Sequence, residues 1–381
     1  MKLASLAFKN ALRSKRRTIL TVLSIAFFAG VICFMHTVLK AFESWEGQAD
    51  LYSRVAVMSK VNLTNNLPPA HMNYLETLPD VSTVNRSDWF GGMVSDRQED
   101  FFANFASDPE NWNEIWEELK IDPAQYKAYC ENRQGALVGR SLAKRFDWKI
   151  GSRVTLRGTI YPVNPELTIV AMFDGPNKND ENQFMFHWEY FNQLMDGKAS
   201  VGVFWLKVKT KEAVPRVMEE VDRHFENTND PTKSMTEKEF ARMFASMMGD
   251  IGLLVRSIGV SVVVLMILIV ANTLAMSARE RAVETSAMRV LGFGRRAIVG
   301  MVLFESMLVT VAGALLGVGI PVLLFNGFKL SMGAWFPEFP VANATIILSA
   351  AIAGTVGLTA GLFPAWLNAR LPIVEGLRRV G

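Results

Sequence analysis

RERAVETSAMRVLGFGRR, residues 279–296, lies between two long apolar runs and carries five arginines and two glutamates. From Val283 onward its apolar side chains recur at helical spacing, and Gly292 then supplies a signal for a helix end. We interpret the segment as a short exposed helix of a shape that a soluble partner binds. The alternative is a solvated turn whose arginines only fix the orientation of the chain in a membrane.

Four uncharged apolar runs surround this segment, over residues 18–39, 257–278, 306–328 and 339–369. Each is long enough to cross a bilayer, which takes roughly 20 residues. The first run is longer than the apolar part of a secretory signal, and no small-residue cleavage site follows it. We therefore expect four membrane spans, the first of them retained.

The charges are divided unevenly between the segments. Residues 43–250 contain 23 Lys/Arg and 32 Asp/Glu, whereas the rest of the chain contains 17 and 5. The basic residues outside that range cluster in 2–17, 279–296 and 370–379, and four spans place these three clusters on one face. Basic loops stay in the cytoplasm. We therefore expect a plasma (inner) membrane protein with cytoplasmic termini and an acidic outer domain, and no nucleic-acid partner.

The predicted fold class is an α-helical membrane protein with four transmembrane helices and a large α+β extracytoplasmic domain between spans 1 and 2. The predicted parts are an amphipathic interfacial helix (1–17), spans (18–42, 251–278, 297–328 and 344–369), the extracytoplasmic domain (43–250), a cytoplasmic coupling segment (279–296), a short outer loop (329–343) and a cytoplasmic tail (370–381).

Within the outer domain, alternating and helical patterns predict ordinary soluble elements. We expect strands over 54–61, 168–173 and 201–209, a strand–helix–strand unit over 135–158, a helix over 214–225, and an acidic helix bearing Trp112, Trp116 and Leu119. Residues 96–200 are interpreted as an inserted subdomain. Thr236-x-x-Glu239 is a capping box, and the helix that it begins is predicted to run from about Glu237 to beyond Ala278.

Small and charged residues within the spans are candidates for helix packing and for polar contacts. Gly313-x-x-x-Gly317 and Gly357-x-x-x-Gly361 have the spacing that lets two membrane helices approach closely. Glu305 lies inside the third apolar segment, where a carboxylate must face protein, water or the interface. It either contacts the basic cytoplasmic segments or reaches the inner membrane surface.

The sequence lacks the common motifs of catalysis. It has no G-x-x-x-x-G-K-[ST] phosphate loop, no H-E-x-x-H and no G-x-S-x-G. Its two cysteines, Cys33 and Cys130, lie in different predicted parts, and its four histidines are scattered. We therefore expect a non-enzymatic chain without a cofactor or metal of its own.

Four segments resemble the MacB/FtsX-like permease family of ABC transporters. They are LAFKNALRSKRRTILT (6–21), GALVGRSLAKRF (135–146), residues 281–298, and residues 364–378 with LPIVEGLR at 371–378. Their order and spacing agree with the family over nearly the whole chain. No recognisable pattern occurs within 99–128 and 174–199, where members of the family differ, so the substrate stays open.

The resemblance implies a permease that transmits ATP-driven motion to its outer domain for efflux or mechanotransmission. Its alternatives are a lipoprotein-releasing permease and a division-type regulator of a cell-wall hydrolase. The implied partners are an ABC ATPase subunit that binds ATP and Mg, a second permease copy in a homodimer, a periplasmic adaptor or outer-membrane component, and membrane lipid. The ATPase-coupling residues are then Glu284, Arg289, Val290, Leu291 and Gly292.

Overall fold

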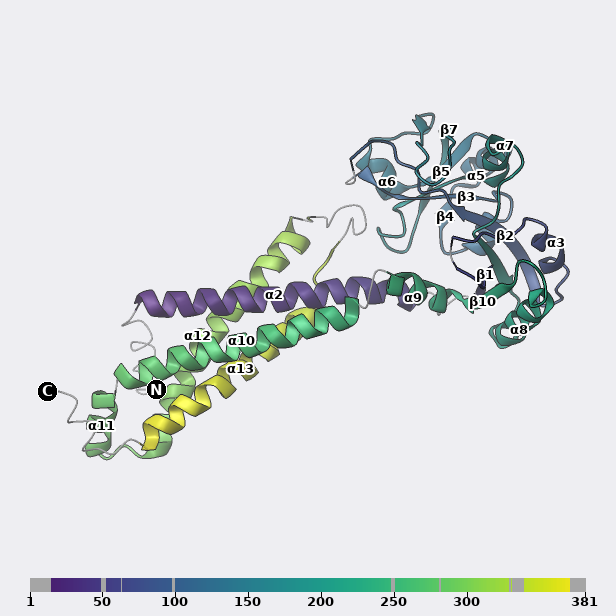
Figure 1. Ribbon diagram of the computed structural model, residues 1–381. Coiled ribbons are helices and arrows are strands. Elements are labelled where there is room, and N and C mark those ends of the chain that lie inside the picture. The colour runs from purple at the N-terminus through teal and green to yellow at the C-terminus, as the bar shows by residue number, and fades with distance from the viewer. Residues whose placement is uncertain are drawn as a thin grey trace. The chain divides into compact units, whose positions relative to one another are not determined.

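The computed structural model describes residues 15–48, 53–62, 64–97, 100–247, 251–280, 282–328, 330 and 339–370. The chain forms two compact units, a helical unit built from the apolar segments and an α+β domain within residues 42–249 (Figure 1).

The helical unit contains the apolar segments found in the sequence. Its elements are α2 (Lys15–Gln48), α10 (Ile251–Glu280), α11 (Ala282–Val290), α12 (Arg295–Pro321), the π-helix η3 (Val322–Gly327) and α13 (Asn343–Arg370). Among the described residues, four helices are long and apolar enough to cross a membrane, namely α2, α10, α12 with η3, and α13. The predicted fold class is confirmed. Residues 1–14 of the predicted interfacial helix, 371–381 of the tail and 331–338 of the outer loop lie outside the described residues.

The centre of the helical unit is apolar. The side chains that meet there come from α2, α10 and α13, and are Ile25, Ile32, Met266, Val270, Val356 and Ala360. Other apolar side chains of α10, such as Leu254 and Leu268, are exposed. In a membrane helix such positions face lipid or another subunit.

The α+β domain is built on a single sheet. Its strands are β1 (Arg54–Ser59), β2 (Val81–Trp89), β3 (Ala103–Ser107), β4 (Lys120–Ile121), β5 (Gly135–Gly139), β6 (Arg153–Thr155), β7 (Glu166–Asp174), β8 (Gln183–His187), β9 (Val203–Val208) and β10 (Thr232–Thr236). Its helices are α3 (His71–Leu75), α4 (Trp112–Ile115), α5 (Pro123–Glu131), α6 (Arg140–Arg145), α7 (Trp188–Leu194), the 3-10 helix η2 (Lys211–Ala213), α8 (Val214–Phe225) and α9 (Glu237–Met247).

In the described part of the domain the sheet has ten strands in the order β10-β1-β9-β2-β3-β8-β5-β7-β4, with β6 also paired to β7. Two pairs, β3 with β8 and β5 with β7, are parallel, and the others are antiparallel. The strands of the predicted insertion, residues 96–200, lie together on one side of the sheet. Of these strands, β3 pairs with β2 and so connects them to the rest of the sheet. The insertion therefore extends one sheet instead of forming a sheet of its own.

Helices cover both faces of this sheet, and alternate residues of each strand point to opposite faces. Val55 and Val57 of β1 face the larger core, which α3, α6, α7 and α8 cover. Ala56 and Met58 face the other side, where α4 and α9 pack. The buried aromatic side chains of both cores belong to residues of this domain, so its hydrophobic core is its own.

Helix α9 begins as the sequence predicts. The Thr236 backbone N–H donates to Glu239 Oε2 at 2.9 Å, and the Glu239 N–H donates to Thr236 Oγ1 at 3.2 Å, which confirms the capping box. Whether α9 continues into α10 falls on residues 248–250, outside the described residues. The acidic Trp-bearing helix is shorter than the sequence predicts: α4 ends at Ile115, whose carbonyl accepts a hydrogen bond from the Arg54 guanidinium at 2.9 Å, and Trp116 has the non-helical angles φ −107° and ψ 56°.

The last strand, β10, is held from outside the sheet as well as by β1. Asp222 of α8 accepts hydrogen bonds from the Ser234 backbone N–H at 2.8 Å, the Ser234 hydroxyl at 2.7 Å and the Thr232 hydroxyl at 3.1 Å. In the described residues no strand pairs with β10 on its other side.

Candidate functional site

The coupling segment folds as helix α11, a tight turn and the first turn of α12. Gly292 adopts φ +91°, a left-handed conformation that glycine takes without strain. The Gly292 N–H donates to the Arg289 carbonyl and the Phe293 N–H donates to the Met288 carbonyl, both at 3.1 Å. This pair of bonds is a Schellman motif, in which glycine ends a helix and its last carbonyls are satisfied. The predicted helix end at Gly292 is thus present in the backbone.

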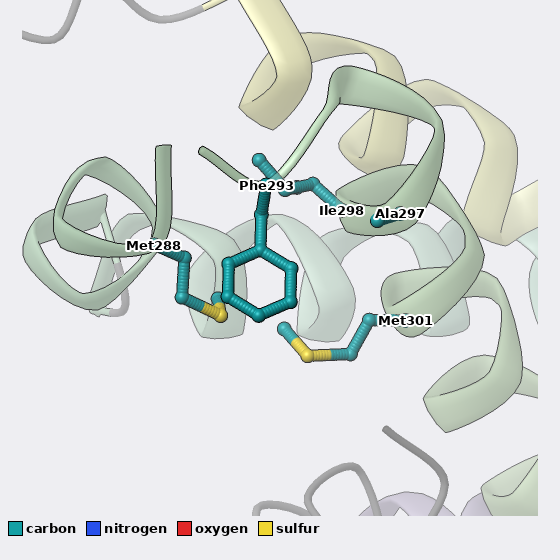
Figure 2. A pocket seen from close by; sticks show the side chains of 5 residues that line it. All are labelled: Met288, Phe293, Ala297, Ile298 and Met301. Atoms are coloured by element: carbon teal, nitrogen blue, oxygen red, sulfur yellow. The ribbon is translucent and has the colours of Figure 1, made fainter. Parts of the chain in front are cut away.

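The residue after the glycine packs back onto both helices. Figure 2 shows the Phe293 ring between the side chains of Met288 and Met301. The apolar pocket around it is lined by these three residues together with Ala297 and Ile298. A contact between this position and the last turn of the helix commonly accompanies a Schellman motif. Here the contact extends to α12, so the turn is packed on the membrane-spanning helix that follows it.

Two apolar side chains at the turn are exposed. Val290 is 63% exposed and Leu291 is 77% exposed. Basic side chains lie nearby in sequence: Arg279, Arg295 and Arg296 are exposed, and Arg289 is half-buried. Glu284 lies in α11, and its side chain falls outside what the structure describes. The turn therefore presents an apolar tip with basic side chains beside it. Protein interfaces commonly have this arrangement, with apolar anchor residues at the centre and charged residues at the rim.

The first pair of spaced glycines lies where α12 meets α2. A Cβ built on Gly313 would lie 2.6 Å from the Ile25 side chain, and one built on Gly317 would collide with the backbone of Ala26. A Cβ on Gly30 of α2 would lie 3.1 Å from the Gly317 carbonyl oxygen. The two helices touch along their backbones here, which only small residues allow.

The second pair lies where α13 meets α12. A Cβ built on Gly357 would lie 2.5 Å from Thr310 Oγ1, and one on Gly361 would lie 3.0 Å from Ser306. The Ser306 hydroxyl donates to the Gly357 carbonyl at 2.5 Å, a direct hydrogen bond between the two helices. Helix α12 is thus packed closely on both α2 and α13.

Glu305 is buried on α12, four residues after Met301 and seven after Ile298. That spacing places its carboxylate on the same helix face as the Phe293 pocket, about one turn further along. Its predicted contact with the basic segments stays a prediction.

Two of the buried polar clusters in the described part of the α+β domain bring together residues far apart in the sequence, and the sequence did not single them out. Arg54 is 3% exposed and forms ion pairs with Glu118 at 2.9 Å and Glu237 at 2.7 Å. Its guanidinium also lies over the Trp116 ring, 4.3 Å from the centroid. The cluster joins the first strand, the α4 segment and the first residue of α9. Burial raises the pKa of Glu237 despite the nearby arginine.

The second cluster surrounds Asp88 of β2, which is 4% exposed. Its carboxylate accepts from Tyr161 Oη at 2.7 Å and Asn66 Nδ2 at 3.2 Å. Burial raises the pKa of Asp88 to about 7, although hydrogen bonds from Tyr161, Trp89 N–H and Asn66 act in the opposite direction. Among the described residues, no group of three or more His, Cys, Asp or Glu side chains is arranged to hold a metal ion.

Comparison with known proteins relates both units to one family. A profile of the MacB-like periplasmic core domain matches residues 18–224, and a profile of the FtsX-like permease C-terminal region matches residues 256–373. An uncharacterized ABC transporter permease of Methanocaldococcus jannaschii is 20% identical over 401 aligned positions, covering 98% of this chain and 96% of that protein.

Other relatives match part of the chain. The macrolide export ATP-binding/permease protein MacB of Neisseria gonorrhoeae is 26% identical over 235 residues, covering 55% of this chain and 33% of that protein. The crystal structure of the periplasmic region of MacB from Actinobacillus actinomycetemcomitans covers 51% of this chain and 92% of its own, with 10% identity and a TM-score of 0.37. The first profile covers the first apolar helix and most of the α+β domain, the second covers the later apolar helices, and the chain belongs to the MacB/FtsX-like family of ABC transporter permeases.

Proposed function

We propose that this chain is the non-catalytic membrane subunit of an ABC transporter and that a separate ATPase, which binds ATP and Mg, docks on the tip of the coupling segment. The observation that supports this most is the exposure of Val290 and Leu291 on a turn whose backbone hydrogen bonds form a Schellman motif. The relatives above are named an ABC transporter permease and an ATP-binding/permease protein, and this chain covers 33% of the latter. In this proposal the segment carries motion from the ATPase into the spans and on to the outer domain.

The tip predicts the chemistry of its partner. Val290 and Leu291 would enter an apolar cleft, and the exposed Arg279, Arg295 and Arg296 would meet carboxylates at its rim. Truncating a well-buried anchor costs about 2 kcal/mol or more, which is roughly 30-fold in affinity. Charged pairs at a rim are screened by salt. Binding should therefore weaken with ionic strength and depend strongly on Leu291.

Co-purification of the ATPase with the full chain tests the docking proposal. Leu291→Ala or Val290→Glu should weaken the affinity for the ATPase about 30-fold and so lower the amount that co-purifies, while membrane insertion stays normal because topology depends on the arginines. The matched control is Leu315→Ala, which removes a similarly exposed leucine of α12. Wild-type retention of the ATPase by the Leu291 and Val290 variants would mean that the segment only orients the chain.

We also propose that both termini and the coupling segment are cytoplasmic and that the α+β domain lies outside. The distribution of basic residues supports this orientation. In a chain without its native cysteines, a cysteine at Lys178 should react with an impermeant reagent in intact cells, and one at Arg296 only after permeabilisation. Arg296 is a better reporter than Ser286, whose side chain is buried. Labelling at 296 in intact cells would overturn the orientation.

Among the activities open to the family we propose export, working as a dimer of two permease copies. Relatives named macrolide export proteins support export, and the exposed apolar side chains of α10 leave room for a second copy. Lipoprotein release and control of a cell-wall hydrolase are the alternatives. Deletion of the chain should raise intracellular accumulation of a macrolide, whereas retained lipoproteins or a cell-separation defect without accumulation would favour an alternative.

A further inference from the structure

Few backbone hydrogen bonds stabilise the connection between α11 and α12. On one side, the Phe293 N–H is bonded back to Met288 of α11. On the other, the Ala297 and Ile298 N–H groups donate to the Gly294 carbonyl at 3.0 and 3.4 Å. No backbone hydrogen bond among the described residues crosses from one set to the other. The angle between the helices is therefore set at Phe293 and Gly294.

Gly294 itself does little to fix that angle. It is the N-cap of α12, with φ −67° and ψ 156°, and as a glycine it offers no side chain to accept from the first N–H groups. A Cβ at this position would have no heavy atom within 4 Å. Glycine also has the widest backbone freedom of any residue. A rotation of the backbone at this position therefore meets little steric resistance.

The Phe293 side chain supplies the missing restraint. Its ring lies against Met288 of α11 on one side and against Ala297, Ile298 and Met301 of α12 on the other (Figure 2). Ile298 and Met301 are themselves buried, so the α12 side of the pocket belongs to the packed part of the unit. Turning α11 about Gly294 would pull the ring out of this pocket and expose apolar surface.

We propose that Phe293 is the positioning residue that makes α11 and α12 move as one body, an inference that rests on the proposed function. When the ATPase pushes the exposed tip, the ring transfers the displacement to the start of α12. Helix α12 then carries it to α2 and α13 through the close contacts at Gly317 and Gly357. Without the ring, the tip would swing at Gly294 while α12 stays in place.

The test compares Phe293→Ala with Phe304→Ala in the full chain, reconstituted with its ATPase in lipid nanodiscs. Both phenylalanines are 42% exposed, and Phe304 lies on α12 but does not line the pocket. Phe293→Ala should bind the ATPase as the wild type does, because the tip is intact. The rate of ATP hydrolysis in its presence should equal the rate of the ATPase alone. Phe304→Ala should keep full stimulation.

A conservative replacement separates positioning from folding. Phe293→Met refills the pocket with an apolar side chain and should restore stimulation, and gel filtration should show wild-type behaviour for every variant used. The inference is overturned if Phe293→Ala stimulates hydrolysis like Phe304→Ala, or if it loses the ATPase, which would make Phe293 part of the docking surface. Normal binding by Leu291→Ala would instead refute the docking proposal, whatever Phe293 does.

Discussion

Replacing Asp88 by asparagine should remove most of a pH dependence from the stability of the α+β domain. The side chain is buried, and the groups around it are neutral: Tyr161, Asn66 and the Trp89 backbone N–H. The nearest cation along β2, Arg86, is paired with Asp108 at 2.8 Å. Asparagine has the same shape as the protonated acid and can still accept from Asn66. It therefore mimics the neutral form at every pH.

The magnitude follows from the two pKa values. Asp88 has an ordinary pKa of 3.8 and a pKa of about 7 in the folded protein. Each tenfold change in protonation is worth about 1.36 kcal/mol, so the whole difference amounts to about 4 kcal/mol. Because the folded state holds a proton that the unfolded state has lost between these values, the free energy of unfolding falls as pH rises from about 4 to about 7.

The assay is urea unfolding of residues 43–250 at several pH values, because the hydrophobic core of the domain lies within that range. Asp174 has a pKa lowered by Arg140 and changes stability in the opposite direction, so only the difference between variant and wild type is interpreted. Between pH 4 and pH 8, the free energy of unfolding of Asp88→Asn should rise by about 4 kcal/mol relative to that of the wild type. A difference that stays constant with pH would refute the reasoning.

Three further predictions concern packing and folding. Gly317→Val should sharply lower the thermal stability of the detergent-solubilised chain because its Cβ would meet the Ala26 backbone, whereas Gly319→Val, with nothing within 4 Å, should not. Arg54→Met should cost the domain about 3 kcal/mol in urea unfolding by leaving two half-buried carboxylates without their cation, and Arg216→Met, at an exposed pair, less than about 1 kcal/mol. The fragment 43–250 should unfold cooperatively on heating; an unfolded fragment would show that it needs the spans.

The features that the sequence predicts are those that depend on residues close together in the chain. The four spans depend only on the length and composition of a run, and no partner is needed to recognise them. The capping box at Thr236 lies within four residues, and Gly292 ends its helix by its own conformation. In the α+β domain, β7 alternates between buried and less buried residues along its whole length. In β9 the alternation is broken at Trp205, which is buried like its neighbours Phe204 and Leu206 because helices cover both faces of the sheet.

The features that the sequence does not predict depend on distant residues. Arg54 lies 64 positions from Glu118 and 183 from Glu237. No local sequence pattern at any of these three residues indicates that they form ion pairs. The strand β10 reads TKSMT, without apolar alternation, and is held by pairing to β1 and by Asp222. The one local hint was a charged residue opening the apolar run RVAVMS, which is buried throughout.

The bonds from Asp222 to β10 also bear on how copies of the domain behave beside one another. A terminal strand with open N–H groups is a template on which a neighbouring chain can add a strand, and such pairing leads to aggregates. Here one carboxylate already occupies the Ser234 N–H, and the nearby hydroxyls are bound as well. A neighbouring copy of the domain therefore meets a β10 edge whose Ser234 N–H is already bonded, and Asp222→Ala should free that group for pairing with another strand.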